Sequence, residues 1–163
     1  MEQKQKVLDA LGEMQIPYEC VEHPAVYTIE EMQKLDFPQG AVIAKNLFLR
    51  DAKGKRHFLV VVGSEQAINL KEMEGKLGST KLSFASDERL GKYLGLTKGA
   101  VSPFGLLNDP EGKVEFYLDD TLLKEDKVGI HPNDNTATVF ISGPDIVKFA
   151  ASTGHKTNPL RLK

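Results

Sequence analysis

The clearest hydrophobic pattern in the chain is a pair of apolar segments at residues 42–50 and 57–62. β-Branched and aromatic residues are frequent in both segments, which favours extended strands. Residues 51–54 between them, Asp-Ala-Lys-Gly, are typical of a turn. The two segments are therefore predicted to form a β-hairpin within a sheet.

One charged residue lies in the middle of the first segment. On a two-residue period Lys45 shares a face with Ile43, Leu47 and Leu49, so the pattern points its ammonium group toward apolar neighbours. An ammonium group that leaves water without a partner destabilises the fold or loses its proton. Lys45 is therefore predicted to have a partner, a route to water or a ligand.

The rest of the chain mixes short amphipathic segments with short apolar ones. Helices are predicted at residues 4–14, 28–35, 69–77, 87–94 and 144–153, and further strands at 18–22, 81–85, 114–118 and 138–142. Loops are predicted at 97–110 and 129–135. Because strands outnumber helices and do not alternate with them strictly, the fold class is predicted to be α/β (α+β), one domain with a mixed β-sheet flanked by short helices. The domain is expected to span residues 1–155, with a flexible C-terminal tail at 156–163.

Composition narrows the class of protein. The chain has 163 residues and a net charge of −2, which argues against a coat for long nucleic-acid duplexes but allows binding to a nucleic-acid end. The longest uninterrupted apolar run, residues 58–62, is far shorter than a membrane helix, and the N-terminus resembles no secretory signal. We therefore expect no membrane partner and a cytoplasmic location. Cys20 and the four histidines lack the spacing of metal ligands, so no metal or other cofactor is expected.

Three segments carry polar or small residues that a core does not need: Lys45 with Asn46, residues 99–103, and residues 129–135. Each also has a purely structural explanation. Lys45 can lay its methylene groups on apolar surface and free its charge at the sheet edge. Glycine and proline in the second segment can simply make a turn, and His131 can be a loop histidine bonded to nearby backbone. From the residues alone, the chain has a candidate pocket around a lysine, and no substrate follows.

Read together and in order, four segments resemble the YbaK/ProX family of aminoacyl-tRNA deacylases, which includes the editing domain of bacterial prolyl-tRNA synthetases. The matching segments are His23-Pro24 with residues 27–31, residues 45–49, residues 99–105 with Asn108-Asp109, and residues 129–132 with Asn135-Thr136. The resemblance implies a curved, YbaK-like sheet and hydrolysis of an aminoacyl ester without a cofactor. The free-standing ProX-type branch, which removes alanine from mischarged Ala-tRNA(Pro), is the most similar.

The resemblance also implies roles for particular residues. Lys45 would be essential, Asn46 would help to hold the ester, and the loop that begins at Gly99 would close over the aminoacyl end; these three are the expected catalytic residues. His131 would help to set the size of the amino-acid pocket. The expected substrate-binding residues are Ile29, Leu47, Ala100, Val101, Ser102, Pro103, Ile130 and His131.

The implied partner is the aminoacylated acceptor end of tRNA, with prolyl-tRNA synthetase as a further candidate; the oligomeric state stays open. Arg50 and Lys81 are candidate contacts to tRNA phosphates on the basis of charge and position. Whether Lys45 anchors a phosphate or stabilises an oxyanion is also open. The alternatives are a deacylase for another small amino acid, such as Cys-tRNA(Pro), a non-catalytic module that binds the aminoacyl group or tRNA, and a hydrolase of small free esters.

Overall fold

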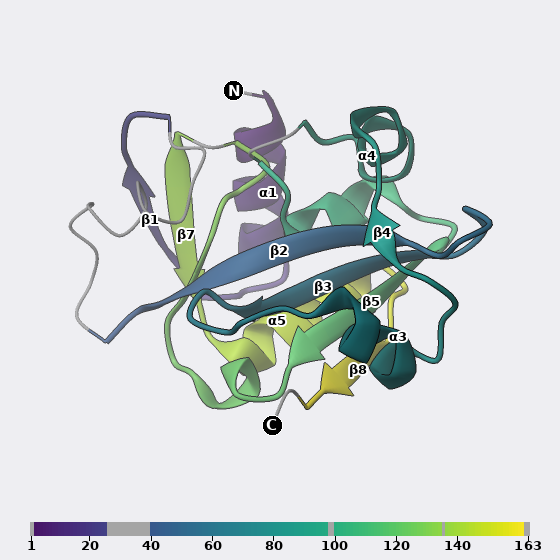
Figure 1. The fold of residues 1–163 in the computed structure, drawn as a ribbon. Coiled ribbons are helices and arrows are strands. Elements are labelled where there is room, and N and C mark those ends of the chain that lie inside the picture. Colours follow the sequence, from purple (N-terminus) through teal and green to yellow (C-terminus); the bar gives the residue numbers. More distant parts are fainter. Residues whose placement is uncertain (1, 26–39, 98–99, 135, 162–163) are drawn as a thin grey trace.

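The computed structural model describes residues 2–25, 40–97, 100–134 and 136–161. In this part of the chain one mixed sheet has the strand order β1-β7-β6-β2-β3-β5-β8, with β4 paired to β2 outside that path (Figure 1). The strands are β1 (Glu19–Glu22), β2 (Val42–Arg50), β3 (His57–Gly63), β4 (Ser83–Phe84), β5 (Val114–Asp119), β6 (Val128–Ile130), β7 (Ala137–Ile141) and β8 (Thr157–Leu160). The predicted fold class is confirmed, and β2 and β3 form the predicted antiparallel hairpin.

Short helices lie on both faces of this sheet. They are α1 (Glu2–Glu13), α3 (Leu70–Leu77), α4 (Asp87–Leu94) and α5 (Gly143–Ser152), with 3-10 helices η1 (Pro103–Asn108) and η2 (Leu122–Lys124). Their starts follow from the sequence, because the side chains of Asn69, Ser86 and Ser142 accept hydrogen bonds from the first turns of α3, α4 and α5. No helix in the described part of the chain is long and apolar enough to cross a membrane.

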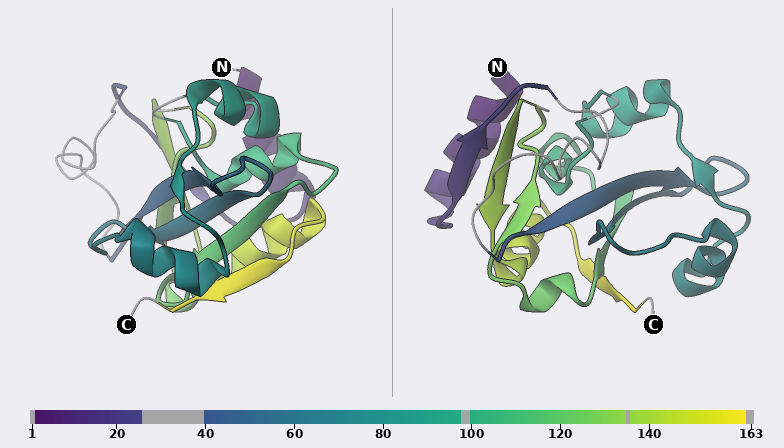
Figure 2. Two further views of the ribbon diagram at one scale, coloured as in Figure 1. Left: turned by 45° about the vertical axis from the view of Figure 1, so that its right-hand side comes forward. Right: turned by 60° about the vertical axis from the view of Figure 1, so that its left-hand side comes forward.

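The sheet separates two hydrophobic cores. The main core lies on the side of α1, α4 and α5 and includes Ala44 and Phe48 of β2. The second core lies on the side of α3 and includes Leu47 and Leu49 of the same strand. Figures 1 and 2 show α3 on one side of the β2–β3 hairpin and α1 and α4 on the other. Alternate residues of β2 therefore point into different cores, which fixes the direction of every side chain along it.

The C-terminal segment corrects one expectation. Residues 157–160, expected to lie in a flexible tail, form β8, which pairs in parallel with β5. The prediction failed because Asn158 and Pro159 suggest a loop, whereas Leu160 is buried in the second core and Asn158 donates to the Phe116 carbonyl oxygen. The segment is tied to the sheet by tertiary contacts that have no periodic signature.

Three smaller differences concern the predicted loops and strands. Val128–Ile130, placed in a loop by the sequence, are the short strand β6 between β2 and β7. The proline- and glycine-rich segment contains the 3-10 helix η1, whose N-cap is Ser102. The strand expected at 81–85 is only two residues long. The helix expected at 28–35 lies outside the described residues.

Candidate functional site

Lys45 projects from β2 toward the α3 side of the sheet, as the alternation of the strand requires. It is half-buried, and its Nζ donates a 2.9 Å hydrogen bond to the main-chain oxygen of Gln66, in the segment between β3 and α3. An ammonium group has three donors. Gln66 is the one hydrogen-bond partner of Nζ among the described residues, and the other two donors have no partner there.

Lys45 also lies in a part of β2 whose outer edge is not paired with another described strand. One edge of β2 pairs with β6 only at Val42 and Ile43 and with β4 only at Leu49 and Arg50. Between these two pairings that edge has no strand partner in the part of the chain that the structure describes. A ligand can therefore approach the backbone of β2 at Lys45 without displacing a strand.

Gly129 lies on the same face of the sheet as Lys45, and we call Gly129 with the side chains of Ile43 and Phe140 the Gly129 floor. Gly129 pairs with Ile43 of β2 and Phe140 of β7, so all three share the face from which Lys45 projects. A Cβ atom at Gly129 would lie 2.8 Å from both Ile43 Cδ1 and Phe140 Cε1 and 3.2 Å from Thr138 Cγ2. Glycine is therefore required for these side chains to close the floor.

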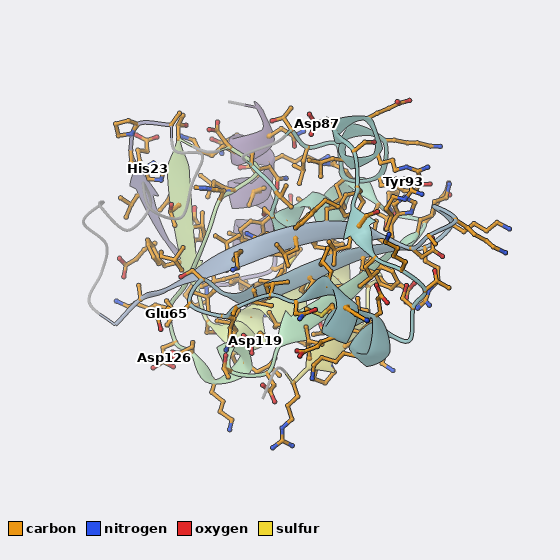
Figure 3. All side chains as sticks on the ribbon, viewed as in Figure 1. His23, Glu65, Asp87, Tyr93, Asp119 and Asp126 are labelled. Atoms are coloured by element: carbon orange, nitrogen blue, oxygen red, sulfur yellow. The ribbon has the colours of Figure 1, made fainter. Side chains whose placement is uncertain are left out.

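His131 and His23 lie over the β7 side of the same face. Figure 3 shows His23 next to β1 and β7. The His23 Nε2 is 2.8 Å from Thr138 Oγ1, and the two imidazole rings are 6.0 Å apart, centre to centre. Ile43, Gly129 and Thr138 therefore lie on one face of the sheet between Lys45 and the two histidines.

The protonation state of His131 follows from its surroundings. Burial lowers the pKa of His131, the charge of His23 lowers it further, and the hydrogen bond to Ala137 opposes them. The Nδ1 is 2.8 Å from the Ala137 carbonyl oxygen, which can only accept, so Nδ1 carries the proton. The ring is then neutral at pH 7, and no partner for Nε2 lies among the described residues. His131 therefore offers a hydrogen-bond acceptor to the site.

Asn46 points the other way. It lies on the face of Ala44 and Phe48, toward the main core, and its Oδ1 is buried with no hydrogen-bond partner in the described part of the chain. Such an orphaned acceptor is uncommon and calls for a ligand or water. Because Lys45 and Asn46 leave the strand on opposite faces, they can reach one ligand only around the open edge of β2.

The loop expected to cover the aminoacyl end is described from Ala100 onward; Gly99 and the predicted pocket residue Ile29 lie outside the described residues. Ala100, Ser102 and Pro103 are buried and Val101 is half-buried against the main core. The Ser102 Oγ accepts from the main-chain N–H of Phe104 at 2.9 Å, which anchors the loop to η1. Ser102 is thus a capping residue in this structure.

The other predicted residues are spread more widely. Leu47 is buried in the second core and Ile130 in the main core. Arg50 is half-buried at the far end of β2, where its guanidinium group donates to the carbonyl oxygens of Asp51 and Ala52. Lys81 is exposed two residues before β4.

A cavity of about 340 Å³ is lined by Ile43, Gly63, Gln66, Glu125 and neighbouring residues; Lys45 does not line it and is linked to it by its hydrogen bond to Gln66. Its volume suits a small ligand. Sequence reasoning did not single out Gln66 or Thr138, because their roles depend on contacts between strands distant in sequence. His23 was part of the matching pattern but was not assigned to the site. No three His, Cys, Asp or Glu side chains in the described segments are placed to hold a metal ion.

Comparison with known proteins places this site in a family. The model of the aminoacyl-tRNA editing domain matches residues 23–149, which include β2, the Gly129 floor and both histidines. The chain belongs to the aminoacyl-tRNA editing domain family. Membership in this family makes it a hydrolase of aminoacyl-tRNA, a deacylase, as the resemblance had implied.

Individual relatives of this editing domain support the assignment. The prolyl-tRNA editing protein ProX of Acetoanaerobium sticklandii is 52% identical over 162 residues, with 99% of each chain covered. The mouse prolyl-tRNA synthetase associated domain-containing protein 1 is 40% identical over 150 residues, covering 89% of this chain and 88% of that protein. A crystal structure described as a candidate trans-editing enzyme for prolyl tRNA synthetase shares the fold, with a TM-score of 0.74, 24% identity and coverage of 100% and 99%.

Proposed function

We propose that this protein hydrolyses the ester bond of mischarged Ala-tRNA(Pro) in trans, with Lys45 as the essential residue. The observation that carries the proposal is the placement of the Lys45 ammonium group, held by one hydrogen bond to Gln66 on the same face as neutral His131. The 52% identity to a protein named as a prolyl-tRNA editing protein supports the choice of tRNA. Prolyl-tRNA synthetase, named in the mouse relative, is the candidate protein partner.

The reaction needs little more than positioning and charge. The oxygen of a water molecule adds to the ester carbonyl, the bond between the acyl carbon and the ribose oxygen breaks, and that oxygen takes up a proton. The products are free alanine and uncharged tRNA. A partly desolvated ammonium group stabilises nearby negative charge far better than one in water, so Lys45 favours the reaction by holding either the terminal phosphate or the developing oxyanion.

The remaining expected residues contribute position. The buried Oδ1 of Asn46, which has no hydrogen-bond partner among the described residues, would accept a hydrogen bond from the aminoacyl adenosine around the open edge of β2. The loop from Gly99 to Pro103 would cover the same edge from the main-core side, where Val101 packs. Arg50 and Lys81 would contact acceptor-stem phosphates, and replacing both by alanine should reduce the dependence of tRNA binding on salt.

Selection of alanine follows from size. A synthetase pocket built for proline cannot exclude alanine sterically, because one or two methylene groups discriminate by only about 1–3 kcal/mol. A separate site that admits alanine and rejects proline must therefore be small. We expect the Gly129 floor, closed by Ile43 and Phe140, and the His131 side chain to limit the space for the amino acid.

The test is alanine release from Ala-tRNA(Pro) by the wild type and by Lys45→Ala, with Lys156→Ala as a matched control. Lys156 is exposed and lies just before β8, on no part of this site. We expect Lys45→Ala to lose about 100-fold or more in rate, as when one stabilising donor is removed, and Lys156→Ala to retain full activity. If Lys45→Ala is as active as the wild type, the proposed role of Lys45 is wrong. If the wild type binds Ala-tRNA(Pro) but releases no alanine, a non-catalytic binding module becomes the better description.

A further inference from the structure

Phe84 is an exposed aromatic residue on the face of the sheet from which Lys45 projects. Its side chain is 60% exposed, and Tyr18, at 39%, is the other large hydrophobic residue exposed in the described part of the chain. Phe84 lies in β4, directly opposite Leu49 of β2. Opposed residues of an antiparallel pair point to the same face, so Phe84 projects from the face that carries Leu49, Leu47 and Lys45.

Neighbouring residues show that this exposure is local. Leu82, two residues earlier and on the same face, is buried in the second core at 3% exposure. Phe84 continues that apolar row beyond the edge of the core, where its ring meets solvent. Its main-chain position is fixed, because the N–H of the next residue, Ala85, donates to the Phe48 carbonyl oxygen at 2.9 Å. The Phe84 ring therefore extends into solvent from a main chain that is fixed by a hydrogen bond.

Charged groups of both signs lie near the strand pair that carries Phe84. Arg50 pairs with Ser83 and therefore projects from the opposite face, where its guanidinium group is held at the hairpin turn by two carbonyl oxygens. The Glu74 carboxylate accepts from the N–H of Leu82. Lys81 is exposed three residues before Phe84. Tyr18 precedes β1, at the opposite end of the sheet, so it does not extend the patch (Figure 1). A single exposed aromatic ring without a broad apolar centre around it is less typical of a protein–protein interface than of a position on which an unpaired base stacks.

The distance along β2 from Lys45 to Leu49, which lies opposite Phe84, also fits a single-stranded nucleic acid. Lys45 and Leu49 are four residues apart on β2, about 13 Å at the rise of an extended strand. At about 3.4 Å per stacked nucleotide this distance spans roughly four nucleotides. The 3′ end of tRNA carries unpaired nucleotides that end in CCA. With the terminal aminoacyl adenosine at Lys45, an earlier unpaired base would lie beside Phe84.

We propose that Phe84 is a stacking platform for an unpaired base of the tRNA 3′ end, on the face of the sheet that carries Lys45. The proposal rests on the proposed function, because it takes the aminoacyl end to lie at Lys45. Stacking on an aromatic face does not depend on base identity, so Phe84 contributes affinity for the single-stranded end and leaves the identity of the tRNA to other contacts.

The first experiment measures binding and needs no catalysis. The probes are an RNA acceptor-stem hairpin with a single-stranded 3′ ACCA end and the same hairpin with a blunt end. We expect the wild type to prefer the tailed hairpin, Phe84→Ala to bind it about tenfold more weakly, and Phe84→Trp to retain the wild-type affinity. Tyr18→Ala, the matched exposed aromatic, should bind as the wild type does.

Several results would overturn the stacking site. In the first, Phe84→Ala binds the tailed hairpin as tightly as the wild type does. In the second, Phe84→Ala loses the same affinity for both hairpins. In the third, the wild type binds the tailed and the blunt hairpin equally well. If the wild type sediments as a dimer and Phe84→Ala as a monomer, the ring belongs to an interface between copies. Failure of the proposed function is seen separately, as alanine release that does not depend on Lys45, so the two outcomes cannot be confused.

Discussion

At the scale of single residues, the site is defined by how a few polar groups are partnered. Lys45 stands among apolar neighbours and gives one donor to Gln66, which holds the ammonium group in place without neutralising it. His131 gives its Nδ1 proton to Ala137 and keeps Nε2 as an acceptor. The alternation of β2 predicted the direction of Lys45 correctly. The hydrogen-bond partners of Lys45 and His131 could not be predicted. They are the backbone carbonyl groups of Gln66 and Ala137, whose positions depend on tertiary packing.

Shortening His131 should relax the selection against proline. In His131→Ala the removed ring leaves space at the Gly129 floor, so we expect hydrolysis of Pro-tRNA(Pro) to rise about tenfold relative to Ala-tRNA(Pro). The rates of amino-acid release from the two esters give the ratio directly. His57→Gln is the control, since His57 stacks on Phe48 on the opposite face of the sheet. An unchanged ratio in His131→Ala would show that the ring does not bound the pocket.

His57 should make the fold sensitive to acid. Burial, followed by the charge of Arg89, lowers the pKa of His57, whose Nε2 is 3.0 Å from the Arg89 Nη1 and must accept from it. The unfolded chain therefore binds a proton more readily than the folded one, so this stabilisation is present above about pH 6.5 and is lost as the pH falls through that value toward the lowered folded pKa.

The measurement is urea unfolding between pH 8 and pH 5 for the wild type and for His57→Gln, whose amide oxygen can still accept from Arg89. The variant should show a smaller decrease in the free energy of unfolding over this range. Identical slopes for the two proteins would mean that His57 does not contribute to the acid sensitivity.

At the scale of elements, the sequence predicted those that have local signals. The helices α3, α4 and α5 and the β2–β3 turn rest on contacts within a few residues, and they begin and end close to the predicted positions. Ser142, predicted as the last residue of a strand, is the N-cap of α5. β6 and β8 were missed because they are short and are defined by pairing with strands far away in the sequence. Element boundaries that depend on tertiary pairing leave little trace in a single sequence.

The start of α5 allows a sharp test of close packing. A Cβ atom at Gly143 would lie 2.0 Å from the Leu122 carbonyl oxygen, and the Gly143 N–H donates to the Glu125 carbonyl oxygen at 2.8 Å. Gly143→Ala must shift one backbone segment, so we expect it to lower the free energy of unfolding by about 1–3 kcal/mol or more.

Gly75→Ala, inside α3 and with nothing within 4 Å of its Cβ position, is the matched control. It should be neutral or stabilising by about 0.5–1 kcal/mol, because alanine favours helix. Chemical denaturation of both variants decides the matter. Equal stability of Gly143→Ala and the wild type would contradict the packing described at η2.

At the scale of the whole molecule, the C-terminal segment closes the sheet. His155 Nε2 lies 2.8 Å from Asp109 Oδ2 and its Nδ1 lies 2.8 Å from Thr153 Oγ1, with the His155 and Asp109 side chains almost fully buried. The Thr153 hydroxyl also donates to the Ala150 carbonyl oxygen. Asp109 and Thr153 thus hold the imidazole on both sides immediately before β8. Neither partner could be assigned from sequence, because they are 46 positions apart.

Removing one partner of this pair should weaken the whole domain. In His155→Ala the buried Asp109 carboxylate loses its hydrogen bond to the imidazole, so we expect a loss of about 1–3 kcal/mol or more in the free energy of unfolding. Differential scanning calorimetry at pH 7 measures the change, with Lys156→Ala at the adjacent exposed position as the control. A melting temperature equal to that of the wild type would show that the pair does not hold β8 to the domain.

The specificity of the wild-type protein decides whether it is an alanine-specific editing deacylase. The measurement is the rate of amino-acid release from Ala-tRNA(Pro), Pro-tRNA(Pro) and Cys-tRNA(Pro) under one set of conditions. We predict rapid loss of alanine, with proline retained because the small pocket excludes it and with cysteine released no faster than alanine. Release of proline at the same rate as alanine, or of cysteine alone, would contradict an alanine-specific editing deacylase.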